Sequence, residues 1–198
     1  MSSSLSRQER IRVEGSIISK EMPQFALIQT NAEDYFEGWK TTSTGNRYKL
    51  KLLLPEHYPD SIPLLYVVSP HTLKRHGQTP INSLGGNHDF HTNRNGPNGC
   101  VSICHFTKEA WDASRTSVQV LAMGILWLEC HSLHLITGKT IAEIAEELEK
   151  RKVNTQQHDN KKRHFGGTEL QRIQYASSYL ENLAKKDIHM KYYCNNFP

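Results

Sequence analysis

Four strand-like runs follow one another closely between residues 25 and 68, and no other feature restricts the possible folds as strongly. The runs cover residues 25–30, 35–42, 47–54 and 64–68. A Thr-Gly-Asn turn signal separates the second run from the third. Spacers this short can join only antiparallel neighbours, so the sequence predicts a four-stranded antiparallel meander.

A helix is expected before the meander. Ser6 and Glu9 match a capping box, in which two side chains satisfy backbone donors at the start of a helix. Pro23 predicts that the helix ends near this residue. We expect its apolar side to contain Ile11, Ile17 and Ile18. We expect Arg7, Arg10 and Arg12 to be exposed to water.

Residues 114–136 are predicted to form the central helix, which we expect to be buried because residues 118–128 are strongly apolar. Thr116 or Ser117 can cap its start, and Gly138 suits a left-handed cap at its end. The apolar part is too short to span a membrane, and charged Glu129 lies near its end. We therefore expect no transmembrane segment.

The remaining chain is expected to form an appendage. A second capping box at residues 140–143 opens a short helix that ends near residue 150. Residues 154–167 have the composition of a linker, and a final helix with one apolar stripe is expected at 168–186. The expected organisation is an α/β (α+β) domain at residues 1–150, followed by a linker and C-terminal helical extension at 151–198.

Composition limits the class of protein further. The chain has 198 residues, of which 37% are hydrophobic, so it can bury a core without disulfides. Its net charge of +4 is mild and the basic residues are spread out, which argues against nucleic acid as a partner. Four irregularly spaced cysteines do not suggest a disulfide framework, and the first residues show no apolar signal segment. These features favour a reducing cytoplasm with free thiols.

The long segment before Cys104 is rich in Gly, Asn, Pro and His, a composition that is typical of functional or disordered loops. A thiolate can carry an activated carboxyl group as a thioester, and a nearby amide can stabilise the oxyanion formed when an amine attacks it. Cys104 or Cys100 is therefore a candidate nucleophile, and Asn93 is a candidate oxyanion donor. His91 and His105 are close enough in sequence to tune the thiol. The alternative is that Cys104 is a small buried residue in a strand-like stretch.

The order of these elements resembles that of the ubiquitin-conjugating enzyme family. The stretch 55–63, with its Tyr-Pro-x-x-x-Pro turn, is similar to the stretch after the family's third strand. The tripeptide 91–93, His-Thr-Asn, resembles the family's His-Pro-Asn. Cys104, followed by Trp111, is similar to the family's acyl-carrying cysteine and the Trp after it. The resemblance covers about residues 5–150 and is closest to divergent bacterial members found in antiviral operons.

Some residues depart from the family's pattern. Thr92 replaces the proline of the tripeptide, and His105 follows the cysteine where an aliphatic residue is usual. The loop from Asn93 to Cys104 is longer than in typical members. Cys100 lies nearer the family's spacing and is the rival nucleophile. Cys104 is preferred because its distance to the following Trp fits better.

The resemblance implies an acyltransferase with a cysteine thioester intermediate. It would carry a ubiquitin-like protein on Cys104 and pass it to a lysine of a target protein. Asn93 would support the attack, and His91 belongs to the same motif. Asp112 would face the incoming amine, although an ordinary surface carboxylate is the simpler interpretation.

The resemblance also implies the partners. A cognate activating enzyme would load the modifier and would contact the first helix at Arg7, Arg10 and Arg12, unless these arginines are merely solvated. No cofactor is needed by this protein, because ATP is consumed upstream. The implied setting is a bacterial antiviral conjugation pathway in the cytoplasm, without a membrane or nucleic-acid partner.

Two alternatives remain open at the level of sequence. A catalytically inactive relative would keep the fold and only bind a ubiquitin-like protein. A zinc-stabilised interaction domain would use His88, His91, Cys100 and Cys104 as ligands, although this spacing is not one of the recurring zinc patterns.

Overall fold

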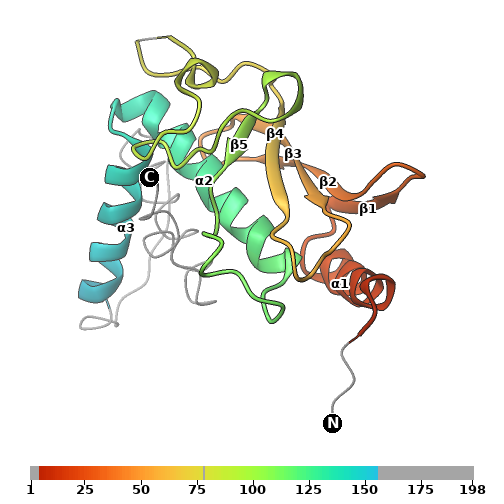
Figure 1. The fold of residues 1–198 in the computed structure, drawn as a ribbon. Helices are drawn as coiled ribbons and strands as arrows, with labels where there is room; N and C mark the ends of the chain where they lie inside the picture. The colour runs from red at the N-terminus through yellow and green to blue at the C-terminus, as the bar shows by residue number, and fades with distance from the viewer. Residues whose placement is uncertain (1–4, 78, 156–198) are drawn as a thin grey trace.

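A single antiparallel sheet with helices on one side and at its end organises the protein (Figure 1). The computed structural model describes residues 5–77 and 79–155. Its helices are α1 (Arg7–Glu21), α2 (Ser117–Thr137) and α3 (Ile141–Thr155), with short 3-10 turns η1 (Ile81–Leu84) and η2 (Pro97–Gly99). Its strands are β1 (Phe25–Gln29), β2 (Asp34–Thr41), β3 (Arg47–Leu54), β4 (Leu64–Ser69) and β5 (Val101–Ile103).

The sheet has the strand order β1-β2-β3-β4-β5, and every neighbouring pair is antiparallel. The four predicted strands are confirmed to within one residue at each end. The prediction of four strands is incomplete, because β5 adds a fifth beside β4 with Ile103 opposite Leu65. Val101 and Ile103 belong to the hydrophobic core. Burial of these two side chains stabilises a strand that has only three residues.

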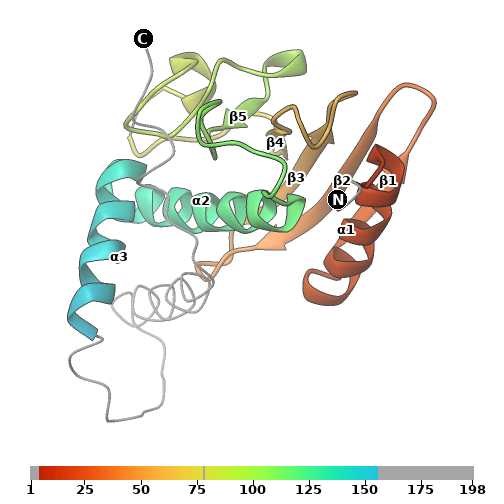
Figure 2. The same ribbon diagram turned by 60° about the horizontal axis from the view of Figure 1, so that its bottom comes forward.

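Helix α2 crosses one face of the sheet and is buried along most of its length (Figure 2). It begins at Ser117 rather than at residue 114, because Thr116, one of the two expected caps, forms a capping box with Gln119. It ends at Gly138, whose φ of 73° confirms the expected left-handed cap. Among the described helices, only α2 has the length and the apolar composition of a membrane-spanning helix. Of its most apolar stretch, 83% is buried inside the protein.

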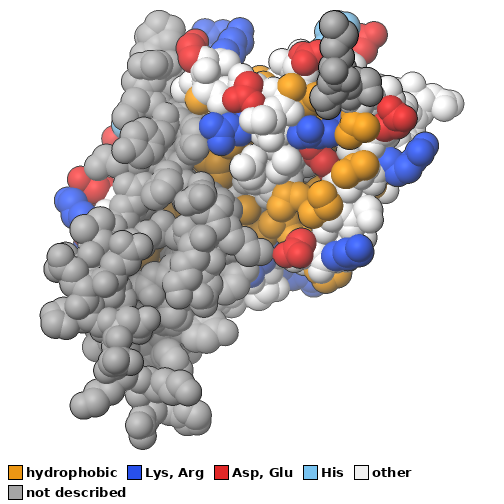
Figure 3. All heavy atoms as spheres, turned by 90° about the horizontal axis from the view of Figure 1, so that it is seen from below, with side chains coloured by type: hydrophobic (Ala, Val, Ile, Leu, Met, Phe, Trp, Pro, Cys, Tyr) orange, Lys and Arg blue, Asp and Glu red, His pale blue; other side chains and the backbone are white. Residues whose placement is uncertain are grey.

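Helix α1 begins with the predicted Ser6–Glu9 capping box, but its buried side differs from the expectation. Ile11 and Ile18 are buried, whereas Ile17 is 41% exposed. Glu14 takes the inner position between the two buried isoleucines. Apolar side chains therefore lie among charged ones on the face that α1 helps to form (Figure 3).

The expectation that all three arginines of α1 lie in water is also corrected. Arg7 pairs with Asp34 at 2.5 Å and donates to backbone carbonyl groups near the end of β3. Arg10 pairs with the buried carboxylate of Glu14 at 2.5 Å and donates to the carbonyl of Arg115 at 2.6 Å. Only Arg12 of the three is classed as exposed. Arg7 and Arg10 therefore connect α1 to the rest of the domain.

Helix α3 starts at the predicted capping box, in which Thr140 and Glu143 exchange bonds of 2.7 and 3.1 Å. It continues to Thr155, past the end expected near residue 150. Ile141, Ile144 and Leu148 belong to the hydrophobic core, so α3 is part of the domain. The linker and final helix predicted for the C-terminal extension lie outside the described residues.

Candidate functional site

The tripeptide 91–93 lies antiparallel to the segment that ends at Cys104. The backbone N–H of Cys104 donates to the carbonyl of His91 at 2.9 Å, and the N–H of Asn93 donates to the carbonyl of Ser102 at 2.8 Å. Thr92 and Ile103 form the bridge between these two bonds. The structure thus places the tripeptide directly beside Cys104.

The side chain of Asn93 reaches the backbone next to Cys104. Its Nδ2 donates to the carbonyl of Ile103 at 3.4 Å, and the residue is partly buried. This bond is long, and it orients the amide towards the peptide group that joins Ile103 to Cys104. An amide held at this point can donate to an oxyanion formed near the sulfur, provided that it gives up this bond.

The long loop between Asn93 and Cys104 does not separate the two residues, because it doubles back. The N–H of Gly96 donates to the carbonyl of Cys100 at 2.8 Å, and η2 lies between them. Asn98 and Gly99 take positive φ values of 57° and 77° to make this reversal. The extra residues therefore form a closed turn that returns the chain to β5.

Cys100 lies at the start of β5, away from the tripeptide. It is a buried free thiol and lies close enough to Tyr66 to contribute to the raised pKa of that phenol, after the main effect of burial. Cys104 follows it by four positions of extended chain, which corresponds to roughly 13 Å. Of the two cysteines, the backbone of the tripeptide contacts only Cys104 within the described residues.

The structure bears out the alternative that Cys104 is a small buried residue beside a strand, and it contradicts the expectation of a free thiol. Cys104 is 5% exposed and is disulfide-bonded. The other two cysteines of the described range, Cys100 and Cys130, are free. Burial follows from its place directly after β5, since every residue from 101 to 106 is buried.

His91 is a buried and neutral residue in this arrangement. It is 6% exposed, has a φ of 48° and closes a turn through its N–H to the carbonyl of His88. Burial, assisted by nearby His88, lowers the pKa of its imidazole to about 4. Its Nδ1 has no hydrogen-bond partner. At neutral pH this ring supplies no positive charge to a thiolate.

His105 is also buried and neutral. Its Nε2 lies 2.9 Å from the carbonyl oxygen of Pro63, and burial lowers its pKa to about 4. The residues that could have formed a thiolate–imidazolium pair with Cys104 are therefore uncharged at pH 7. Neither ring therefore supplies a positive charge that would favour a thiolate at Cys104.

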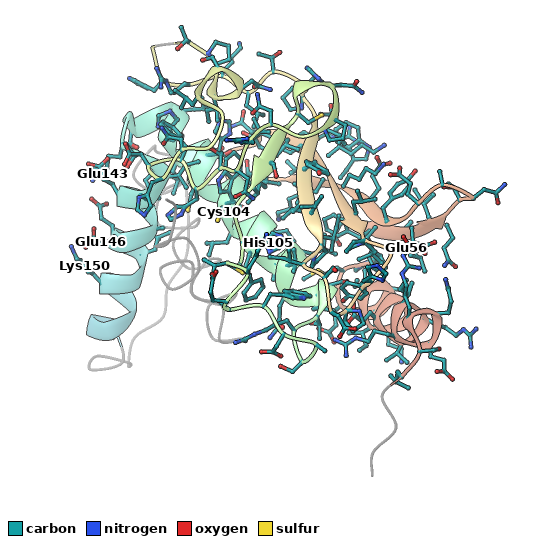
Figure 4. The ribbon with its side chains drawn as sticks, viewed as in Figure 1. Glu56, Cys104, His105, Glu143, Glu146 and Lys150 are labelled. Carbon is teal, nitrogen blue, oxygen red and sulfur yellow. The ribbon has the colours of Figure 1, made fainter. Side chains whose placement is uncertain are left out.

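Trp111 brings the segment after Cys104 against the loop between β3 and β4. Its Nε1 donates to the carbonyl of Pro59 at 2.8 Å. Its ring packs against those of Tyr58 and Phe106, with centroid distances of 6.3 and 5.6 Å. The Tyr-Pro-x-x-x-Pro stretch and the Trp of the sequence pattern thus meet in space. Cys104 and His105 directly follow β5 in the same part of the chain (Figure 4).

Asp112 is an exposed carboxylate that closes a local turn. It accepts a bond from the N–H of Ser114 at 2.7 Å and another from its hydroxyl. These bonds hold the pKa of Asp112 below its usual value. The group is thus a turn cap and remains ionised, and no contact connects it with Cys104 in the described part of the chain.

The proposed zinc ligands do not form a site. Among the described residues, no group of three or more His, Cys, Asp or Glu side chains is arranged to hold a metal ion. His88 and His91 have ring centroids 5.7 Å apart, and Cys100 lies at the opposite end of β5 from the tripeptide.

A buried polar network beside the site was missed by sequence reasoning. Glu14 is 1% exposed and accepts bonds from the hydroxyl of Tyr58 at 2.6 Å and the N–H of Ser117 at 3.0 Å, in addition to Arg10. It therefore joins α1 to the start of α2 and to the ring that packs on Trp111. The sequence feature that could have revealed this network is Glu14, which lies at helical spacing between Ile11 and Ile18 on the apolar side of α1.

Comparison with known proteins adds no family assignment. No family model matches the chain, and no curated protein matches it.

Proposed function

We propose that this protein has a ubiquitin-conjugating-enzyme-like fold and carries a ubiquitin-like protein as a thioester on Cys104. The observation that carries the proposal is the pairing of the His-Thr-Asn tripeptide with Cys104, which directs the Asn93 amide at the adjacent carbonyl. Support also comes from the meander, the central helix and the contact of Trp111 with the Tyr-Pro turn, which follow one another in the family's order. A cognate activating enzyme and a target protein are the partners that this function requires.

The proposed reaction has two balanced steps. The thiolate of Cys104 attacks the carbonyl carbon of an incoming thioester, a C–S bond to Cys104 forms, and the donor leaves as a thiolate. A lysine amine then attacks the same carbon, a C–N bond forms and the amine loses a proton to solvent. The C–S bond breaks and restores the thiolate of Cys104. Asn93 donates to the oxyanion that forms in each tetrahedral intermediate.

The test uses a short fluorescent peptide thioester as the acyl donor, because the natural modifier is not identified. The full chain is first reduced with a phosphine, which opens the disulfide of Cys104. We expect a fluorescent adduct that free thiols remove, and we expect Cys104→Ala to abolish it. Cys100→Ala is the matched control and keeps the adduct. An adduct that survives Cys104→Ala but not Cys100→Ala would move the nucleophile to Cys100, and no adduct in the reduced wild-type protein would contradict acyl carriage.

The burial of Cys104 favours a second candidate function, a non-catalytic module that binds a ubiquitin-like protein. A carrier thiol must be reached by a large partner, and a side chain that is 5% exposed is not reached without movement. Iodoacetamide decides between the two candidates in the reduced protein. Alkylation of Cys104 that is no faster than alkylation of an unfolded peptide favours the binding module, whereas faster alkylation favours the carrier.

A further inference from the structure

His105 is an unusual residue to find directly behind a proposed carrier cysteine. It is 3% exposed, and its imidazole has one hydrogen bond, from Nε2 to the carbonyl oxygen of Pro63 at 2.9 Å. Its Nδ1 is buried without a partner. An aliphatic side chain would fill the same position without burying an unsatisfied nitrogen, so the bond to Pro63 is the feature that distinguishes histidine here.

That bond fixes the tautomer of the ring. A carbonyl oxygen only accepts, so Nε2 carries the hydrogen and Nδ1 holds the lone pair. Burial keeps the ring neutral, with a pKa of about 4. His105 is therefore a permanent N–H donor over the whole pH range in which thioesters exchange with amines.

The bond also fixes the backbone after Cys104. Pro63 lies at the end of the loop between β3 and β4, and the same loop accepts the bond of Trp111 through the carbonyl of Pro59. On the other side of the sulfur, the N–H of Cys104 is held by the carbonyl of His91 at 2.9 Å. Cys104 thus stands between two fixed points, of which one is the His105–Pro63 bond.

We infer that His105 is a positioning residue, which holds Cys104 in register with Asn93 through its bond to Pro63. The inference rests on the proposed acyl-carrier function and adds to it a residue that does not touch the substrate. If the bond is lost, the sulfur and the Asn93 amide are no longer held at a fixed separation, and transfer slows while the acyl group can still be loaded.

The test compares two amide side chains that place their N–H groups differently. In His105→Gln the side-chain amide lies about as far from the backbone as Nε2 of the histidine does, so it can still donate to the carbonyl of Pro63. In His105→Asn the amide lies only about as far out as Nδ1, so it cannot make this bond. The variants are charged with the fluorescent peptide thioester after reduction, and discharge to free lysine is followed in a single turnover. We expect His105→Asn to lower the rate constant by about 10- to 100-fold, and His105→Gln to stay near the wild-type value. The lysine concentration that gives half the maximal rate should not change.

Matched controls separate positioning from general loss of structure. His131 is also buried, and its Nε2 lies 2.9 Å from the carbonyl oxygen of Lys74, so His131→Asn removes a similar bond on α2. Urea unfolding reports whether each variant is folded. The inference is overturned if folded His105→Asn discharges like wild type, if His105→Gln is slowed as much as His105→Asn, or if His131→Asn is slowed equally. Absence of charging in wild-type protein is a different result, because it removes the proposed function itself.

Discussion

At the scale of single residues, the site is defined by neutral side chains around one sulfur. His91 and His105 flank Cys104, and burial keeps both imidazoles uncharged at pH 7. The chemical work proposed for this site therefore depends on the amide of Asn93 and on the exact placement of the backbone. It does not depend on a proton taken up by histidine.

The first prediction concerns Asn93. Asn93→Ala should leave charging by the peptide thioester intact and slow discharge to lysine by about 10²- to 10³-fold, because the oxyanion loses its donor. Asn95→Ala is the matched control, since it removes another amide–carbonyl bond of the same loop, from Asn95 to Asn82 at 2.6 Å. Single-turnover discharge measures both. Equal slowing in the two variants would mean that the loop, and not the amide of Asn93, supports transfer.

The second prediction concerns acid stability. His91, His105 and His131 have pKa values lowered from 6.5 to about 4, with burial as the main cause of each shift. Below pH 6.5 the unfolded chain binds protons that the folded chain does not bind until about pH 4. The free energy of unfolding should therefore fall as the pH falls from 6.5 to 4, by on the order of 1–3 kcal/mol for each histidine.

Urea titrations at several pH values test this expectation. His105→Gln, which does not titrate, should reduce the pH dependence in that window. His57→Gln replaces an exposed histidine and is the matched control. The same pH dependence in wild type and His105→Gln would show that His105 is not held neutral in the folded protein.

At the scale of elements, α2 packs closely against the sheet because Gly124 has no side chain at the point of contact. A Cβ at Gly124 would lie 2.6 Å from Cδ2 of Leu65 and 3.2 Å from Cδ1 of Leu50, and both leucines are fully buried. In α1, a Cβ at Gly15 would meet Leu27 at an ordinary 3.4 Å. The two helical glycines therefore have different reasons to be present.

The third prediction uses this pair of glycines. Gly124→Ala should destabilise the protein by about 1–3 kcal/mol, because the core has to shift to admit the methyl group. Gly15→Ala should stabilise it by about 0.5–1 kcal/mol, because alanine favours the helix and finds room. Urea midpoints of the two variants measure the difference. Stabilisation by both substitutions would show that α2 can move away from β3 and β4 at little cost.

The fourth prediction concerns the connection of α1 to α2. Glu14→Ala removes the acceptor shared by Arg10, Tyr58 and Ser117. A partly buried charge and a buried hydroxyl then each lose one partner, although Arg10 keeps the carbonyl of Arg115 and Tyr58 keeps the hydroxyl of Ser117. The free energy of unfolding should fall by about 3 kcal/mol. Glu9→Ala is the control on the exposed side of the same helix and should cost about 1 kcal/mol through the capping box. A smaller effect at Glu14 than at Glu9 would contradict the network's role.

At the scale of the whole molecule, features that depend on neighbouring residues were predictable and features that depend on distant contacts were not. The capping boxes of α1 and α3 and the cap at Gly138 were predictable because their bonds are local. The strand β5 was not predicted, since a run of three residues becomes a strand only when β4 lies beside it. Burial of Glu14 likewise depends on segments far along the chain, whereas the strand-like pattern before Cys104 already allowed for its burial.

The fifth prediction concerns the extent of the domain. The described core includes Ile141, Ile144 and Leu148 of α3, packed with α2. In reducing buffer, a chain ended at Thr155 should unfold in one cooperative transition with urea, whereas a chain ended at Gly138 should lose cooperativity because α2 loses its cover. Circular dichroism and tryptophan fluorescence should give coincident curves only for the longer chain. Coincident curves for both would place α3 outside the folding unit.

The bridge between Thr92 and Ile103 has a consequence for solubility. It places residues 91–93 along the outer side of β5, so in the described part of the chain the sheet leaves only β1, a strand of five residues, as an open edge. Fibrils grow when a sheet can recruit strands on two edges. A sheet with one short open edge can pair with a single copy, and growth by edge pairing would stop at a dimer.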